Sequence, residues 1–97
     1  MKTIQLIDRG NFKAREVLRG VLENSKKGME FAEMRNRLKV LDIIDAAKGE
    51  AVDLEDADHA FLVAKIKETQ FALAHNDLFN VLDAVMNPAS DKKIRVV

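Results

Sequence analysis

Cysteine, tryptophan and tyrosine are all absent from the 97 residues, and proline occurs once. Without cysteine the chain can form no disulfide, carries no thiolate nucleophile and cannot build a cysteine-ligated zinc site. Without tryptophan or tyrosine it has few side chains on which a nucleic-acid base could stack. Several common classes of enzyme and binding protein are excluded by these absences alone.

Long apolar runs are also missing. No stretch approaches the roughly 20 apolar residues that a membrane-spanning helix requires. Charged side chains interrupt residues 1–9, so this segment does not resemble a secretory signal. We therefore expect a cytoplasmic protein that has no membrane partner.

Catalytic and phosphate-binding motifs are absent as well. His59 and His75 stand 16 residues apart and belong to no HExxH pattern, and neither Ser25 nor Ser90 lies in a GxSxG motif. The four glycines are isolated, which excludes the glycine-rich loops that hold nucleotides. The sequence therefore predicts no enzyme, no catalytic residue and no cofactor.

An acidic run could in principle hold a cation: Glu50, Asp53, Glu55, Asp56 and Asp58. An EF-hand loop needs glycine at its sixth position and glutamate at its twelfth. Counted from Asp53, these positions are Asp58 and Ala64, so the pattern fails. We interpret the acids as stabilising the first turn of a helix, where the dipole favours negative charge, and we expect no metal site.

What the chain does contain is enough apolar material for one small domain, which we expect to span residues 1–97. Hydrophobic residues make up 47% and charged residues 33%, so disorder throughout is not expected. The net charge is zero but unevenly spread. Residues 1–48 hold 11 Lys/Arg against 7 Asp/Glu, and residues 49–97 hold 5 against 9. Such polarity favours packing of one half on the other, or stacking of copies, unless it is chance placement of solvated charges.

Helical signals occupy most of the sequence. The first helix is predicted to begin after Asn11 as its N-cap and to end in the segment 24–28. A third is predicted to begin near Asp53, and a further cap at Asn76 or Asp77 opens a last helix that Asn87-Pro88 ends.

The strongest helix prediction covers residues 29–48, with Gly49 as its stop. Apolar residues recur there at steps of three and four: Phe31, Met34, Leu38, Leu41 and Ile44. Val40 and Ile43 widen this stripe beyond what one contact requires.

Both ends of the chain carry strand signals. Residues 1–7 alternate loosely in polarity, with Ile4 and Leu6 on one face, and Asp8–Asn11 reads as a turn in which Gly10 takes a positive φ. The tail 91–97 is rich in β-branched residues, and it either pairs with the first strand or reaches a neighbour. Residues 50–54 are interpreted as a connection. The predicted fold is mainly α, a compact three- or four-helix bundle with a short two-stranded element from the N- and C-terminal segments.

Partner binding is the function that these features favour. The phenylalanines are most simply core residues, but some could form an exposed patch. The broad stripe and its basic neighbours predict a partner surface made of Phe31, Met34, Arg35, Arg37 and Lys39. The most direct use of such a surface is homo-oligomerisation or binding of another protein.

Nucleic acid is a weaker alternative. The basic residues between 13 and 39 could form a face that binds phosphates. A helix-turn-helix through Gly49 would, however, present Asp53, Glu55, Asp56 and Asp58 to the groove, where they would repel phosphates. We therefore do not expect nucleic-acid binding, and the basic residues form either a solvated face or a contact for an acidic partner.

Two stretches together resemble small uncharacterised helical proteins of tailed bacteriophages and prophages. They are residues 33–42 running on through Ala46-Ala47, and residues 53–58 with the helix that follows, so the resemblance covers about residues 28–70. It brings no catalytic or binding residues. It implies a phage-encoded protein in the bacterial host cytoplasm or in the virion.

The expected function is therefore a non-enzymatic interaction or assembly subunit that self-associates. The first alternative is a small inhibitor that masks a host protein. The second is a nucleic-acid-associated regulator that uses the basic face of residues 13–39.

Overall fold

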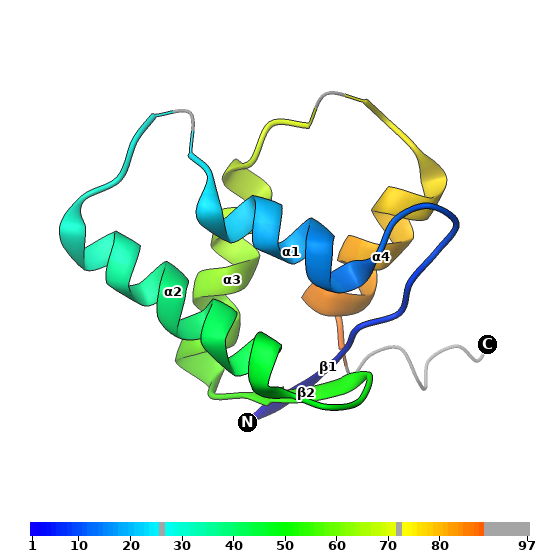
Figure 1. The fold of residues 1–97 in the computed structure, drawn as a ribbon, viewed down its shortest axis with the longest axis horizontal. Helices are drawn as coiled ribbons and strands as arrows, with labels where there is room; N and C mark the ends of the chain where they lie inside the picture. Colours follow the sequence, from blue (N-terminus) through cyan, green and yellow to red (C-terminus); the bar gives the residue numbers. More distant parts are fainter. Residues whose placement is uncertain (26, 72, 89–97) are drawn as a thin grey trace.

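The computed structural model describes residues 1–25, 27–71 and 73–88. Their elements follow in the order β1 (Lys2–Gln5), α1 (Ala14–Glu23), α2 (Phe31–Ala46), β2 (Ala51–Leu54), α3 (Asp56–Glu68) and α4 (Asn76–Met86) (Figure 1). The mainly helical prediction is confirmed, and the elements pack into a compact globule.

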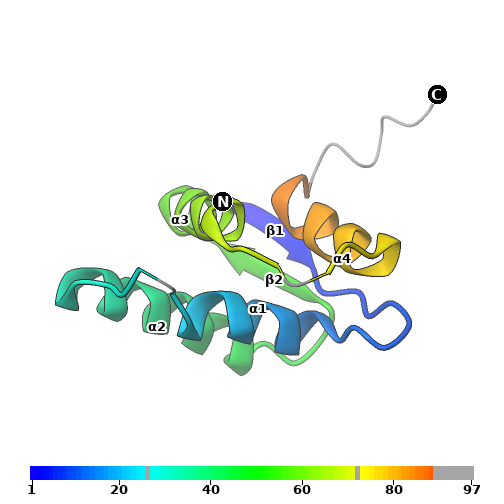
Figure 2. The same ribbon diagram turned by 90° about the horizontal axis from the view of Figure 1, so that it is seen from above.

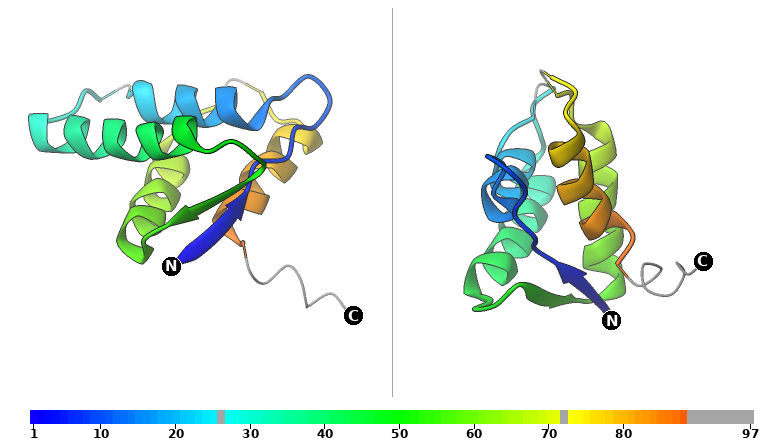
Figure 3. Two further views of the ribbon diagram at one scale, coloured as in Figure 1. Left: turned by 60° about the horizontal axis from the view of Figure 1, so that its bottom comes forward. Right: turned by 90° about the vertical axis from the view of Figure 1, so that its right-hand side faces the viewer.

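The helices form two layers. Helices α1 and α2 lie side by side and run in opposite directions, whereas α3, α4 and the sheet lie on the other side of the molecule (Figures 2 and 3). Buried apolar side chains from every element meet between the layers in one core, which includes Ile4, Leu18, Leu22, Ile44, Leu54, Leu62, Val81 and Val85. No helix of the described ranges is both long and apolar enough to cross a bilayer.

The two-stranded element differs from the one predicted. Strand β1 pairs antiparallel with β2, and Ile4 stands opposite Val52. The segment 50–54 is therefore mostly strand, and its interpretation as a connection was wrong. Val52 and Leu54 point into the core while Asp53 faces solvent and accepts a hydrogen bond from the Thr3 hydroxyl at 2.5 Å. The predicted pairing of the tail 91–97 lies outside the described residues.

Several helix boundaries also need correction. The side chain that holds the start of α1 is Asp8, whose carboxylate accepts from the Ala14 amide at 2.8 Å, and not Asn11. Asp53 belongs to β2, so it cannot cap α3, although Asp56 and Asp58 do lie in the first turn of that helix. The last helix is capped by His75, whose Nδ1 accepts from the Asp77 amide at 3.1 Å.

Other local predictions are confirmed. Gly10 has a φ of 56°, and α4 ends at Met86, directly before Asn87-Pro88.

Gly49 does not have the positive φ of a helix-ending glycine, because α2 already ends at Ala46 with Ala47 extended. His59 is only 7% exposed, and its Nε2 lies 2.9 Å from the carbonyl oxygen of Val85.

Candidate protein-interaction surfaces

The buried face of α2 is rotated away from the predicted stripe. The residues that face the core are Arg37, Val40, Leu41 and Ile44. Phe31, Met34 and Leu38 are instead exposed, at 76%, 44% and 47%. Leu41 and Ile44 of the predicted stripe are buried, and so is Val40, one of the two residues predicted to widen it.

Arg37 explains this rotation. It is 4% exposed, and its Nη1 donates to the carbonyl oxygens of Val21, Leu22 and Asn24 at 3.0 to 3.2 Å. These carbonyls lie at the C-terminal end of α1, where the helix dipole favours a positive charge. Arg37 was predicted as a surface residue for a partner, and this prediction was wrong because its donors are used within the fold.

Arg15 makes the reciprocal contact from α1. Its guanidinium donates to the carbonyl oxygens of Ile44, in the last turn of α2, and of Ala47 and Gly49, which follow it, at 2.5, 2.9 and 2.8 Å. Each of the two antiparallel helices thus supplies the arginine that satisfies the last carbonyls of the other. Neither helix has a basic residue in its own last turn.

Ion pairs occupy further members of the predicted basic face. Arg19 binds Asp45 at 2.6 Å and Glu23 at 2.9 Å, and hydrogen bonds to these carboxylates, Asp45 first, raise the pKa of Arg19. Lys39 lies 3.2 Å from the Asp58 carboxylate. Arg35 remains exposed, as do Lys13 and Lys27. The fold thus engages only part of the predicted basic face of residues 13–39.

Several carboxylates in the described residues are paired with cations. The Arg37 hydrogen bond lowers the pKa of Glu33, which also lies 3.3 Å from Lys65 Nζ. A hydrogen bond from the N-terminal ammonium group lowers the pKa of Asp56. Within residues 1–25, 27–71 and 73–88 no cluster of three or more His, Asp or Glu side chains could hold a metal ion. One buried carboxylate oxygen, Oδ2 of Asp58, has no hydrogen-bond partner there.

The exposed residues of α2 form the first candidate surface, which we call the α2 ridge: Phe31, Met34, Arg35 and Leu38. They occupy positions i, i+3, i+4 and i+7, so they share one side of the helix. The rise of 1.5 Å per residue gives the ridge a length of about 10 Å. Four of the five predicted partner residues are exposed, and three of them belong to this ridge; the fourth, Lys39, is paired with Asp58.

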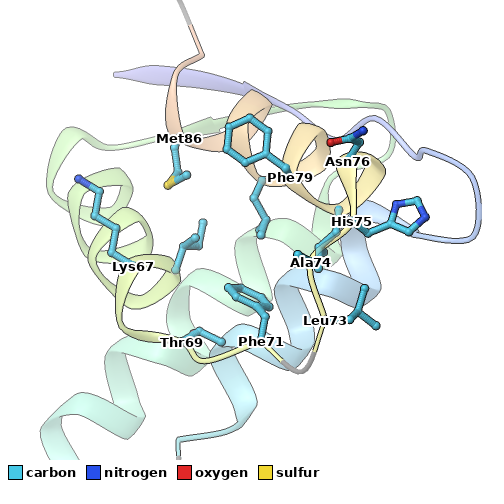
Figure 4. A pocket seen from close by; sticks show the side chains of 12 residues that line it. Lys67, Thr69, Phe71, Leu73, Ala74, His75, Asn76, Phe79 and Met86 are labelled. Atoms are coloured by element: carbon cyan, nitrogen blue, oxygen red, sulfur yellow. The ribbon is translucent and has the colours of Figure 1, made fainter.

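The second surface is an open apolar groove between α3, the loop that follows it and α4, with a volume of about 880 Å³. We call it the α3–α4 groove. Figure 4 shows Phe71 on the loop and Phe79 on α4 bordering the hollow, with Met86 at another edge and Lys67 on the α3 side. Phe71, Leu73 and Phe79 are 43%, 53% and 62% exposed.

Sequence reasoning missed this groove. Phe71 and Phe79 were most simply read as core residues, and Leu73 was not singled out. Phe79 is one residue beyond Leu78 in a helix whose buried side is formed by Val81, Leu82 and Val85, so its helical position already points it away from the core. Among the phenylalanines, Phe12 and Phe61 do pack against the core.

Comparisons with protein-family models, with curated proteins and with solved structures gave no match to this chain. The two exposed apolar surfaces are therefore the features that bear on function.

Proposed function

We infer that this chain is a non-enzymatic protein–protein interaction subunit that associates with copies of itself. One observation carries the proposal: two separate apolar surfaces lie open on a small domain, and their most exposed residues are Phe31 at 76% and Phe79 at 62%. Contiguous apolar patches on a soluble domain usually mark interaction sites. Aromatic residues and methionine are the side chains enriched at such sites.

The charged groups support an interaction role over a catalytic one. Arg15 and Arg37 satisfy helix carbonyls, and Arg19, Lys39 and Lys65 are held in ion pairs. A catalytic group needs a perturbed environment within a cleft. The α3–α4 groove is lined mostly by apolar side chains, with Lys67 and His75 at its margins.

A phage-encoded assembly subunit remains our proposed context, and it comes from the sequence resemblance alone. A subunit of this kind would act in the host cytoplasm or in the particle. An inhibitor that masks a host protein would use the same two surfaces, so the oligomeric state is what separates the two proposals.

Light scattering coupled to size exclusion, over a range of protein concentrations, tests the proposal. Self-association predicts a mass above the 10.9 kDa of one chain. This mass is either a fixed multiple of one chain or a set of multiples that increases with protein concentration. The L38E variant on the α2 ridge should remain monomeric, whereas N36E, an exposed position on another side of α2, should associate as the wild type does. A monomer at all concentrations would contradict self-association and direct attention to capture of a host protein.

A further inference from the structure

We propose that the α2 ridge of one copy docks into the α3–α4 groove of the next, so that the chain assembles head to tail. The inference rests on the proposed self-association and specifies which surfaces meet. It begins from position: α2 and α4 lie on opposite sides of the molecule, with α1 and α3 between them (Figures 1 and 2). A ridge and a groove so placed can meet only between copies.

The shapes of the two surfaces match a familiar mode of recognition. A helix that docks in an apolar groove presents anchors at positions i, i+3, i+4 and i+7. Phe31, Met34 and Leu38 supply three of these positions on α2. The groove offers Phe71, Phe79 and Met86 as the apolar walls that such anchors need.

Charges at the edges of the two surfaces are also complementary. Arg35 occupies position i+4 of the ridge, the one anchor position without an apolar side chain. Asp42 follows Leu38 by one turn. Asp83 lies one turn after Phe79 on α4, just outside the residues that line the groove, and Lys67 lines the groove from α3. Within the described residues neither Arg35 nor Lys67 has an ion-pair partner. A docked ridge can therefore set Arg35 toward Asp83 and Asp42 toward Lys67.

The simplest alternative is a two-fold dimer in which two ridges face each other. An axis near Arg35 would place this residue against its own copy, and like charges in direct opposition cost binding energy. An axis near Leu38 would instead place Arg35 opposite Asp42 of the other copy, so variants that block one surface at a time are needed to separate the two arrangements. Two grooves cannot fill one another, because both are concave.

Head-to-tail contacts have a property that symmetric contacts lack. Each copy carries one ridge and one groove, so blocking the ridge on one copy leaves its groove intact, and the reverse. A ridge-blocked chain and a groove-blocked chain should each be monomeric alone. Mixed together they retain one complete contact and should form a dimer that cannot grow.

The test is therefore a mixing experiment with the full chain. L38E blocks the ridge and F79E blocks the groove; both side chains are exposed, at 47% and 62%, and L38S and F79S repeat the test without added charge. N36E and N80E add the same charge at exposed positions on other sides of α2 and α4 and should assemble as the wild type does. Circular dichroism checks that every variant is folded.

The expected result is a mass of one chain for L38E and for F79E alone, and of two chains for their equimolar mixture. Normal assembly of F79E with loss of assembly in L38E would show that ridges pair with each other and would overturn the inference. A mixture that stays monomeric would also overturn it while leaving self-association in place. If the wild type itself is monomeric at every concentration, the proposed function fails and the docking fails with it.

Discussion

Replacing Arg37 by methionine should lower the free energy of unfolding by about 3 kcal/mol. Methionine keeps much of the aliphatic length of the side chain, so the variant removes the guanidinium without opening a large cavity. What is lost is the set of hydrogen bonds to the carbonyls of Val21, Leu22 and Asn24, together with the ion pair to Glu33 at 2.7 Å. Because the arginine is 4% exposed, water does not replace these contacts at the same site.

The magnitude follows from the kinds of contact removed. Hydrogen bonds to a charged group contribute roughly 1.5–3 kcal/mol each, and breaking a buried ion pair costs roughly 3–5 kcal/mol. Both figures are upper limits here, because the Glu33 side chain is 29% exposed and keeps Lys65 as a partner. The carbonyls at the end of α1 can also move toward water once Arg37 is gone. A loss of about 3 kcal/mol is still a large share of the ~5–15 kcal/mol typical of a domain.

Urea denaturation followed by circular dichroism measures this loss, at one low protein concentration so that association does not contribute. Arg35→Met is the matched control, because Arg35 is exposed on the same helix, and surface changes of this kind usually stay within about 0.5 kcal/mol. The melting temperature of the Arg37→Met variant should fall by about 12 °C or more. Equal stabilities of the two variants would refute the assignment of Arg37 as the residue that caps the C-terminal end of α1.

Four further substitutions test the roles of single residues. Arg15→Met should cost about 1–2 kcal/mol in the same denaturation assay, because its carbonyl partners lie nearer the surface; an unchanged midpoint would contradict its capping role. Gly20→Ala should stabilise α1 by about 0.5–1 kcal/mol, whereas Gly10→Ala should destabilise by about 1–2 kcal/mol because Gly10 has a φ of 56°; shifts of the same sign would contradict this. The Arg37 hydrogen bond lowers the pKa of Glu33 from 4.5, so the stability that it provides is present above pH 4.5 and is lost as the pH falls through the lower folded value. Melting temperatures measured from neutral pH to pH 3 should therefore fall less for Glu33→Gln than for the wild type, and parallel curves would contradict the linkage.

The sequence was sufficient where local rules decide the structure. Gly10 in its turn, the acids in the first turn of α3 and the end of α4 before Pro88 each depend on a few neighbouring residues. The periodicity also predicted where most helices lie. These features could be predicted because capping, dipole and proline effects act over one turn of chain.

The strand pairing could not be predicted in this way. Residues 51–54 form only a short alternating segment, whereas the tail 91–97 carries the denser β-branched signal. What selects β2 is a contact across almost half the chain, in which Ile4 and Val52 are opposite each other and both enter the core. Local propensity gives little information about such pairing, because burial on one face fixes the register.

The predicted partner surface on α2 was partly wrong for a related reason. Both the predicted stripe of α2 and its true buried face repeat at helical spacing, and they share Val40, Leu41 and Ile44. Choosing between them required knowing that Arg37 meets carbonyls of another helix 13 to 16 residues earlier in the chain. A charged residue is rarely assigned to a core without such a partner.

The uneven charge of the sequence acquires a different meaning in the structure. Its N-terminal excess of lysine and arginine predicted packing of one half on the other, stacking of copies, or chance placement, and much of this excess is used within the fold. Arg15 and Arg37 close the ends of α2 and α1, and Arg19 and Lys39 bind carboxylates on neighbouring elements. Exposed apolar surface has no such role within the fold. Its contact with water is unfavourable, and the core is already filled by other side chains. The α2 ridge and the α3–α4 groove are thus the features that folding alone leaves unexplained, and association between copies would explain both at once.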